Sequence, residues 1–93
     1  MALQMIVVGD TTSHGGKVIS GSEAHTIGGR QIARLYDLVD CPESYPDGRL
    51  HGINKIIEAH PTVTIDGQRV ALHGHQTECG CILIGSTTAS VGD

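Results

Sequence analysis

Histidine and cysteine are the residues of this chain whose types and number could bind a metal ion. The 93 residues include six His and three Cys, but no Phe and no Trp. Imidazole nitrogens and thiolate sulfurs are the ligands that Zn²⁺ takes in proteins, about four of them in a tetrahedron. Three cysteines can close at most one disulfide, so a metal is the better candidate for stabilising so small a chain.

An internal repeat places three of these residues at equivalent positions. The stretch T-I-G-G-R-Q-I-A at 26–33 aligns with T-I-D-G-Q-R-V-A at 64–71, and the same shift carries Cys41 onto Cys79. An earlier loop, G-D-T-T-S-H at 9–14, ends in His14 at the corresponding place. Equivalent loops of a repeat fold alike, so these three side chains should converge at one end of the domain.

His51 is the natural fourth ligand. It begins a second H-G unit and follows the long loop after Cys41. The predicted zinc ligands are therefore His14, Cys41, His51 and Cys79. If all four positions are protein ligands, no position stays open for water, and the zinc is structural. The chain is accordingly expected not to be an enzyme.

Two neighbouring candidates have other readings. Cys79 and Cys81 lie two residues apart, so on a strand they would point to opposite faces. The repeat selects Cys79, and Cys81 is expected to be a buried packing residue. His75 takes the place of Asp10 and Asp37, which are more often hydrogen-bond partners in turns. It is kept as the substitute ligand if Cys41 or His51 fails.

Other chemistry has weaker support. The stretch G-D-T-T-S-H-G-G at 9–16 lacks the lysine of a phosphate-binding Walker loop. A nucleophilic pair of Cys79 and His75 is conceivable, but no third residue is indicated that would orient it.

The elements that position these residues are predicted to be short β-strands. The β-prone runs K-V-I, K-I-I and C-I-L-I each follow an H-G or C-G unit, and Asp66–Gly67 marks a hairpin. No segment keeps a 3.6-residue apolar period. Residues 53–59 could form a turn of helix, but the repeat favours a strand. Residues 41–50, rich in turn formers, are expected to be a loop.

Charge and hydropathy limit the possible partners and locations. The formal net charge is −4 with no basic run, which argues against nucleic acid as a partner. No apolar segment approaches the roughly 20 residues of a membrane span. The first ten residues lack the basic region and cleavage site of a signal peptide. One small domain is expected, cytoplasmic unless a signal-independent route exports it.

The chain resembles PAAR-domain proteins over about residues 5–88. The motifs, in order, are G-D-x-T-x-H-G-G at 9–16, V-x-x-G-S at 18–22, I-x-G-x-x-x-A at 27–33, D-x-V-x-C-P at 37–42 and V-A-L-H-G-H-x-T-E-C-G at 70–80. The resemblance implies an all-β, cone-shaped fold of short strands in a pseudo-threefold arrangement, with zinc held by His and Cys at its point.

The family's ligands carry over residue by residue. His14 in T-S-H-G-G and His51 in H-G match two of them, and Cys79 in E-C-G matches the cysteine. Cys41 falls where other members place a His or Cys, within a residue.

The sequence departs from the family pattern in two places. Tyr36 replaces the Gly usual before Asp37, and Ala59-His60 replaces a turn that contains Gly. Both departures bear on local turn geometry.

The resemblance also implies a function. The base of such a domain caps the trimeric valine-glycine-repeat spike of the type VI secretion system, one copy per trimer. The expected protein is a single domain over residues 1–93 with no effector extension. It would be cytoplasmic before firing, then secreted, touching the target membrane transiently and carrying effector proteins as separate chains. The alternatives are an effector-loading adaptor and a small zinc hydrolase.

Overall fold

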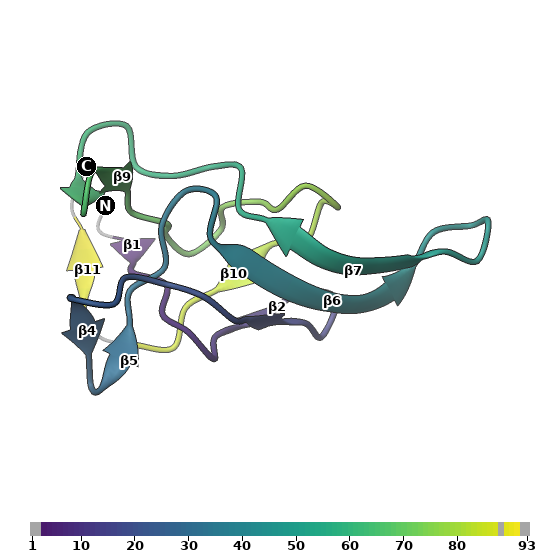
Figure 1. Cartoon of the computed structure of the whole chain (residues 1–93), viewed down its shortest axis with the longest axis horizontal. Coiled ribbons are helices and arrows are strands. Elements are labelled where there is room, and N and C mark those ends of the chain that lie inside the picture. Colours follow the sequence, from purple (N-terminus) through teal and green to yellow (C-terminus); the bar gives the residue numbers. More distant parts are fainter. Residues whose placement is uncertain (1–2, 88, 92–93) are drawn as a thin grey trace.

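Every regular element of the computed structural model is a β-strand (Figure 1), within the residues it describes, 3–87 and 89–91. The all-β fold class is therefore confirmed. The strands are β1 (Leu3–Gln4), β2 (Thr11–Thr12), β3 (Lys17–Val18), β4 (Thr26–Ile27), β5 (Arg30–Gln31), β6 (Leu38–Ser44), β7 (Leu50–Lys55), β8 (Thr64–Ile65), β9 (Gln68–Arg69), β10 (Leu83–Ile84) and β11 (Ser90–Val91).

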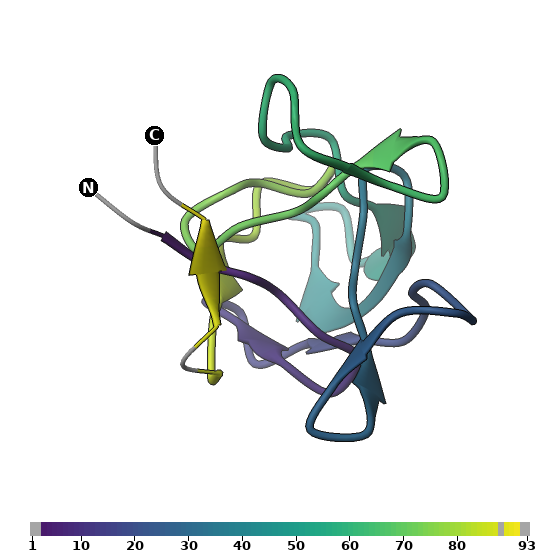
Figure 2. The ribbon, with the colours of Figure 1, turned by 90° about the vertical axis from the view of Figure 1, so that its left-hand side faces the viewer.

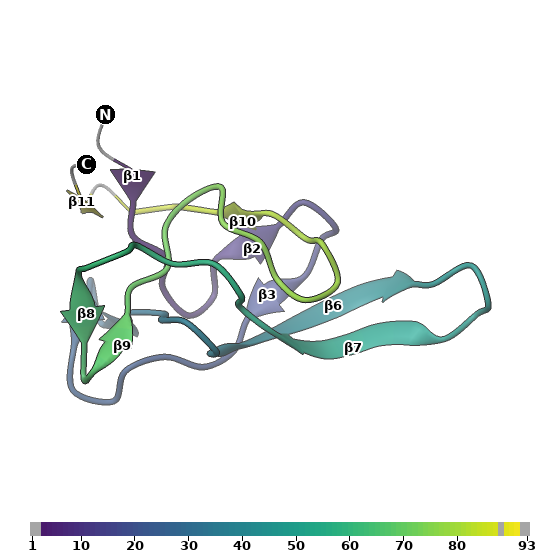
Figure 3. The same cartoon turned by 90° about the horizontal axis from the view of Figure 1, so that it is seen from above.

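The strands form one antiparallel sheet and three small ones. The larger sheet has the order β10-β2-β3-β6-β7, and the others are the pairs β1–β11, β4–β5 and β8–β9. These three pairs lie at one end of the molecule, arranged around its long axis (Figures 1 and 2), and together we call them the base. The β6–β7 hairpin projects from the opposite end (Figure 3).

Three buried residues close a ring of backbone hydrogen bonds about this axis. Ile6 donates its N–H to the carbonyl of Ala71 (3.1 Å), Ala71 to Ala33 (3.1 Å), and Ala33 to Ile6 (2.8 Å). All three residues are fully buried. This cyclic exchange makes the three repeats equivalent, and it confirms the pseudo-threefold arrangement.

Each repeat then turns in the same way. A side chain accepts the backbone N–H of the residue three positions before it, which fixes a tight turn. The donor and acceptor pairs are Val7 and Asp10 (3.0 Å), Arg34 and Asp37 (2.8 Å), and Leu72 and His75 (3.0 Å).

Two of the three sheets of the base are hairpins with two-residue turns, whereas the third pairs strands from the two ends of the chain. Gly28–Gly29 connect β4 to β5, and Asp66–Gly67 connect β8 to β9, all four residues with positive φ. The hairpin predicted at Asp66–Gly67 is confirmed. In the third repeat β11 pairs with β1 from the other end of the chain, with Leu3 opposite Val91.

The core is thin and aliphatic. One cluster includes the three residues of the ring of backbone hydrogen bonds, and a second packs against Leu3, Ile27 and Ile65 of the base strands. Their buried members are Ile6, Val18, Ala33, Val39, Ile56, Ala71 and Leu83 in the first, and Val7, Ile32, Val70 and Leu72 in the second. With no Phe or Trp to bury, this core has little apolar surface to contribute to stability.

The loop prediction for residues 41–50 is wrong for half of that range. Strand β6 continues to Ser44 and β7 begins at Leu50, so only residues 45–49 form the turn. Pro42 is tolerated inside β6 because β3 pairs with that strand only as far as Asp40, and a β-bulge follows Cys41. At such an unpaired edge the missing N–H of proline costs no ladder hydrogen bond. The strand favoured for residues 53–59 is confirmed as far as Lys55.

In each of the three equivalent turns, the residue before the side-chain acceptor (Asp10, Asp37 or His75) has a left-handed backbone. Gly9 has φ 94°, Gly74 has φ 91°, and Tyr36, where the family pattern has Gly, has φ 72°. The turn geometry is thus kept at Tyr36 despite its side chain, which costs about 1–2 kcal/mol relative to an unstrained conformation.

Replacing Tyr36 with Gly should therefore stabilise the protein. Tyr36 is 59% exposed, so little burial is lost. After the added chain entropy of glycine in the unfolded state, the free energy of unfolding should rise by up to about 1 kcal/mol, or roughly 5 °C in the thermal midpoint. Calorimetry of Tyr36→Gly checks this. Gly74→Ala is the matched control: nothing lies within 4 Å of an added Cβ, so backbone strain alone should lower its midpoint. A lower midpoint for Tyr36→Gly would contradict the strain.

Candidate metal centre

Five side chains converge at the end of the body from which the β6–β7 hairpin projects. The ligand atoms of His14, Cys41, His51, Cys79 and Cys81 all lie within 4.8 Å of one another. We call these five residues the donor cluster. The structure thus brings together the four predicted ligands, and it adds Cys81 to them. That they bind a metal stays a prediction.

The turn between β2 and β3 positions His14. The hydroxyl of Thr12 accepts the N–H groups of Gly16 (3.0 Å) and of His14 (3.4 Å), and Gly15 donates to the Thr12 carbonyl (3.0 Å). Gly15 has φ 79°, which favours glycine. Gly16 is a close approach, because a Cβ there would lie 2.3 Å from the Asp40 carbonyl oxygen.

An equivalent turn positions Cys79 and Cys81. Gly80 donates to the carbonyl of Thr77 (3.0 Å), and Thr77 donates to the carbonyl of Cys81 (3.0 Å). Gly80 has φ 87°, so the chain reverses between the two cysteines. Their sulfurs end only 3.1 Å apart.

The expectation that Cys81 points away from the site is therefore wrong, although its burial is confirmed. Alternation of side chains holds for a strand, whereas C-G-C here is a tight turn. The signal that could have found Cys81 is the glycine between the two cysteines, which marks a turn in H-G-G at 14–16 as well.

Cys41 and His51 come from the two paired strands of the hairpin. Cys41 lies opposite Gly52 in the register of β6 and β7. Gly52 has φ 64°, and the buried Asn54 side chain donates to the carbonyls of both His51 (2.9 Å) and Gly52 (3.1 Å). This kink leaves the Nδ1 of His51 3.3 Å from the sulfur of Cys41.

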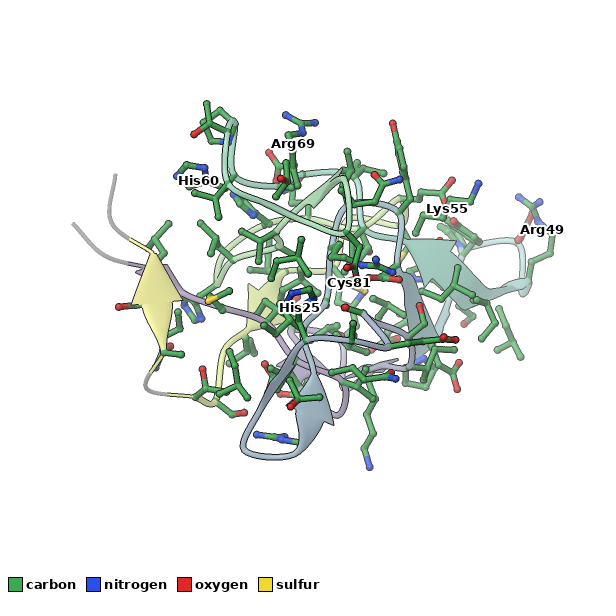
Figure 4. All side chains as sticks on the ribbon, turned by 60° about the vertical axis from the view of Figure 1, so that its left-hand side comes forward. His25, Arg49, Lys55, His60, Arg69 and Cys81 are labelled. Atoms are coloured by element: carbon green, nitrogen blue, oxygen red, sulfur yellow. The ribbon has the colours of Figure 1, made fainter. Side chains whose placement is uncertain are left out.

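Aromatic contacts cover the outer side of the cluster. The Tyr45 ring packs on His51 with centroids 4.3 Å apart, and the Arg49 guanidinium lies over Tyr45, 5.3 Å from its centroid. Arg49 stands at the far end of the hairpin, whereas Cys81 lies inside the body (Figure 4). The donor cluster therefore sits at the root of the hairpin.

The thiols of the cluster differ in acidity. Burial, with hydrogen bonds to Cys41 and Cys79, raises the pKa of Cys81 to about 12. Burial also opposes ionisation of Cys79, but hydrogen bonds from Thr77 and Cys81 outweigh it and lower the pKa of Cys79. A bound metal ion requires thiolates, so its binding would release the proton that Cys81 holds.

Two of the remaining histidines, His60 and His75, stabilise turns. His75, the possible substitute ligand, uses its Nδ1 to accept the Leu72 N–H and lies outside the donor cluster. His60 accepts the N–H groups of Thr62 (3.1 Å) and Val63 (3.0 Å), which stabilises the turn where the family pattern has glycine.

The donor set suits a zinc ion. Three thiols and two imidazoles are the soft and borderline ligands of zinc, and carboxylates are absent from the group. When bound, such an ion would tie together the two turns and the hairpin that supply the cluster.

The family model of the PAAR motif matches residues 8–85, and the chain belongs to this family. The PAAR motif defines a structural family, generally associated with the tips of type VI secretion spikes. A search of curated proteins finds no match. Within the part of the chain that the structure describes, no helix is long and apolar enough to cross a membrane.

Removing the metal should destabilise the protein strongly, because the thin core leaves folding energy to be supplied by the ligands. The purified protein should contain one zinc per chain. Chelation should lower the thermal midpoint by more than about 10 °C, or roughly 2 kcal/mol, and zinc should restore it. Elemental analysis and calorimetry check this. A folded, metal-free protein with an unchanged midpoint would contradict it.

The turn histidine gives a pH dependence that is separate from the metal. Burial lowers the pKa of His75; the Glu58 carboxylate opposes this and His60 adds to it. The unfolded chain therefore binds the proton more readily, and the stability that His75 contributes is full above about pH 6.5 and falls below it.

His75→Asn should flatten this dependence, because its amide oxygen can accept the same N–H without titrating. The free energy of unfolding of the wild type and of the variant is measured with zinc present at pH 7.5 and at pH 5.5. Any loss of zinc at the lower pH then affects the two proteins equally. The wild type should lose stability relative to the variant as the pH falls. His75→Asp is the second control, because the other two turns have Asp10 and Asp37 at the equivalent position. Parallel curves would rule out this role.

Proposed function

We propose that this chain is the structural tip of a type VI secretion spike, seated by its base on the trimeric valine-glycine-repeat spike protein and stabilised at its point by zinc. The observation that carries the proposal is the threefold base at one end of the molecule with the donor cluster toward the other. Membership of the PAAR family supports the same reading.

Among the residues that the structure describes, the base has the symmetry and the unpaired strand edges that a β-trimer could use. Each of its three sheets has only two strands, and an isolated two-stranded sheet is marginal in water. The outer edges of such sheets can pair with strands of a partner. Three equivalent edges about one axis match one copy of the chain to one trimer.

Apolar side chains on these sheets would be covered by the same contact. Ile27 in β4 and Ile65 in β8 occupy equivalent positions and remain partly exposed while packing on the second core cluster. Covering them would add hydrophobic stabilisation to the strand pairing.

The number of donors supports a structural metal over a catalytic one. A catalytic zinc keeps a position open for water, whereas a structural zinc is closed by four protein ligands. The cluster offers five donors, enough to close every tetrahedral position. On this proposal the chain is not an enzyme, and the metal stiffens the root of the projecting hairpin.

The remaining steps follow from the position at the tip. The protein waits in the cytoplasm, leaves the cell whole with the spike and needs no signal peptide. The end of the molecule that carries the β6–β7 hairpin is at the front of the moving spike and touches the target membrane transiently.

Binding to the spike trimer tests the proposal. The wild-type chain should bind at one copy per trimer, measured by native mass spectrometry. Ile65→Asp should weaken binding by at least about tenfold, or 1.4 kcal/mol, with calorimetry confirming that the variant stays folded.

Leu50→Asp is the matched control, since Leu50 is 71% exposed on the projecting hairpin, away from the base. It should bind like the wild type. No binding of the wild type, a stoichiometry of three per trimer, or equal loss in both variants would overturn the base-down arrangement and favour an adaptor that binds elsewhere.

A further inference from the structure

The donor cluster holds one ligand more than a tetrahedral ion can use, and its distances divide the five into two groups. Three donors form a triangle. The Nδ1 of His14 lies 2.9 Å from the sulfur of Cys81 and 3.7 Å from that of Cys41, and the two sulfurs are 3.1 Å apart.

Such a triangle is close to one face of a tetrahedral site. Zinc–sulfur bonds of about 2.3 Å and zinc–nitrogen bonds of about 2.0 Å place neighbouring ligands roughly 3.5–3.8 Å apart. The triangle therefore needs to open by less than about 1 Å to accept an ion. Cys41 and Cys81 are also the two buried thiols of the cluster, which fixes them in the body.

The other two donors each extend from a different corner of this triangle. The Nδ1 of His51 lies 3.3 Å from Cys41, and the sulfur of Cys79 lies 3.1 Å from Cys81. Both are partly exposed. They also belong to different elements, His51 to the β6–β7 hairpin and Cys79 to the turn at 77–80.

We infer that His14, Cys41 and Cys81 form the constant face of the metal site, and that His51 and Cys79 compete for the fourth position. This inference rests on the proposed metal centre, and it changes the ligand set expected from the sequence by adding Cys81. With His51 bound the hairpin is tied to the ion by both of its strands, through Cys41 and His51. With Cys79 bound the hairpin keeps Cys41 alone, and the ion stays in place.

Cobalt binding by single variants tests the inference, because Co²⁺ reports ligand number and type in its absorption. The central comparison is Cys81→Ala with Cys79→Ala, the same change made two residues apart. Cys79→Ala and His51→Ala should each bind one Co²⁺ within about tenfold of the wild-type affinity, whereas Cys81→Ala and the double variant His51→Ala/Cys79→Ala should lose at least about a hundredfold.

The spectra keep the inference testable even if Cys81→Ala fails to fold. In Cys79→Ala only Cys41 and Cys81 remain as thiols, so a tetrahedral spectrum with two thiolate charge-transfer contributions requires Cys81. His51→Ala should show three. One thiolate contribution in Cys79→Ala, wild-type affinity in Cys81→Ala, or loss of cobalt in either His51→Ala or Cys79→Ala alone would overturn the inference. A wild type that takes up neither cobalt nor zinc would instead overturn the proposed metal centre.

Discussion

The ring of backbone hydrogen bonds through Ile6, Ala33 and Ala71 is the interaction on which the rest of the fold depends. It joins three segments far apart in the sequence at one buried layer, and each segment then turns in the same way and sends a loop toward the same end. Two of the three residues of this layer are alanines, whose small side chains let the backbones approach closely. Convergence of the donors follows from the ring.

The same geometry explains what the proposed metal would contribute to stability. Short strands radiating from one axis leave an aliphatic core with little apolar area to bury. The projecting hairpin extends past this core, so its root lies where packing contributes least. Coordination is short-ranged and strong and needs no interior volume, so it can stabilise a narrow end that hydrophobic burial cannot reach.

The convergence of the donor loops was predictable from the sequence, because equivalent segments of a repeat adopt the same local fold. The alignment that equates His14 with Cys79 also predicts that their loops meet, and the structure places both in the donor cluster. Cys81 was missed because the strand rule of alternating faces was applied across Gly80, where the backbone reverses. The length of the β6–β7 hairpin was missed because local composition shows proline and glycine but does not show pairing with a second strand.

The β1–β11 pair differs from its two counterparts in the length of chain between its strands. Turns of two residues close β4–β5 and β8–β9, whereas β1–β11 encloses nearly the whole chain between its strands. Closing so long a loop costs more entropy and depends on contacts of high sequence separation. The β1–β11 pair should therefore be the last of the three sheets of the base to form and the first to open. A partner bound across the base would clamp it shut, so docking would complete the fold as well as attach it.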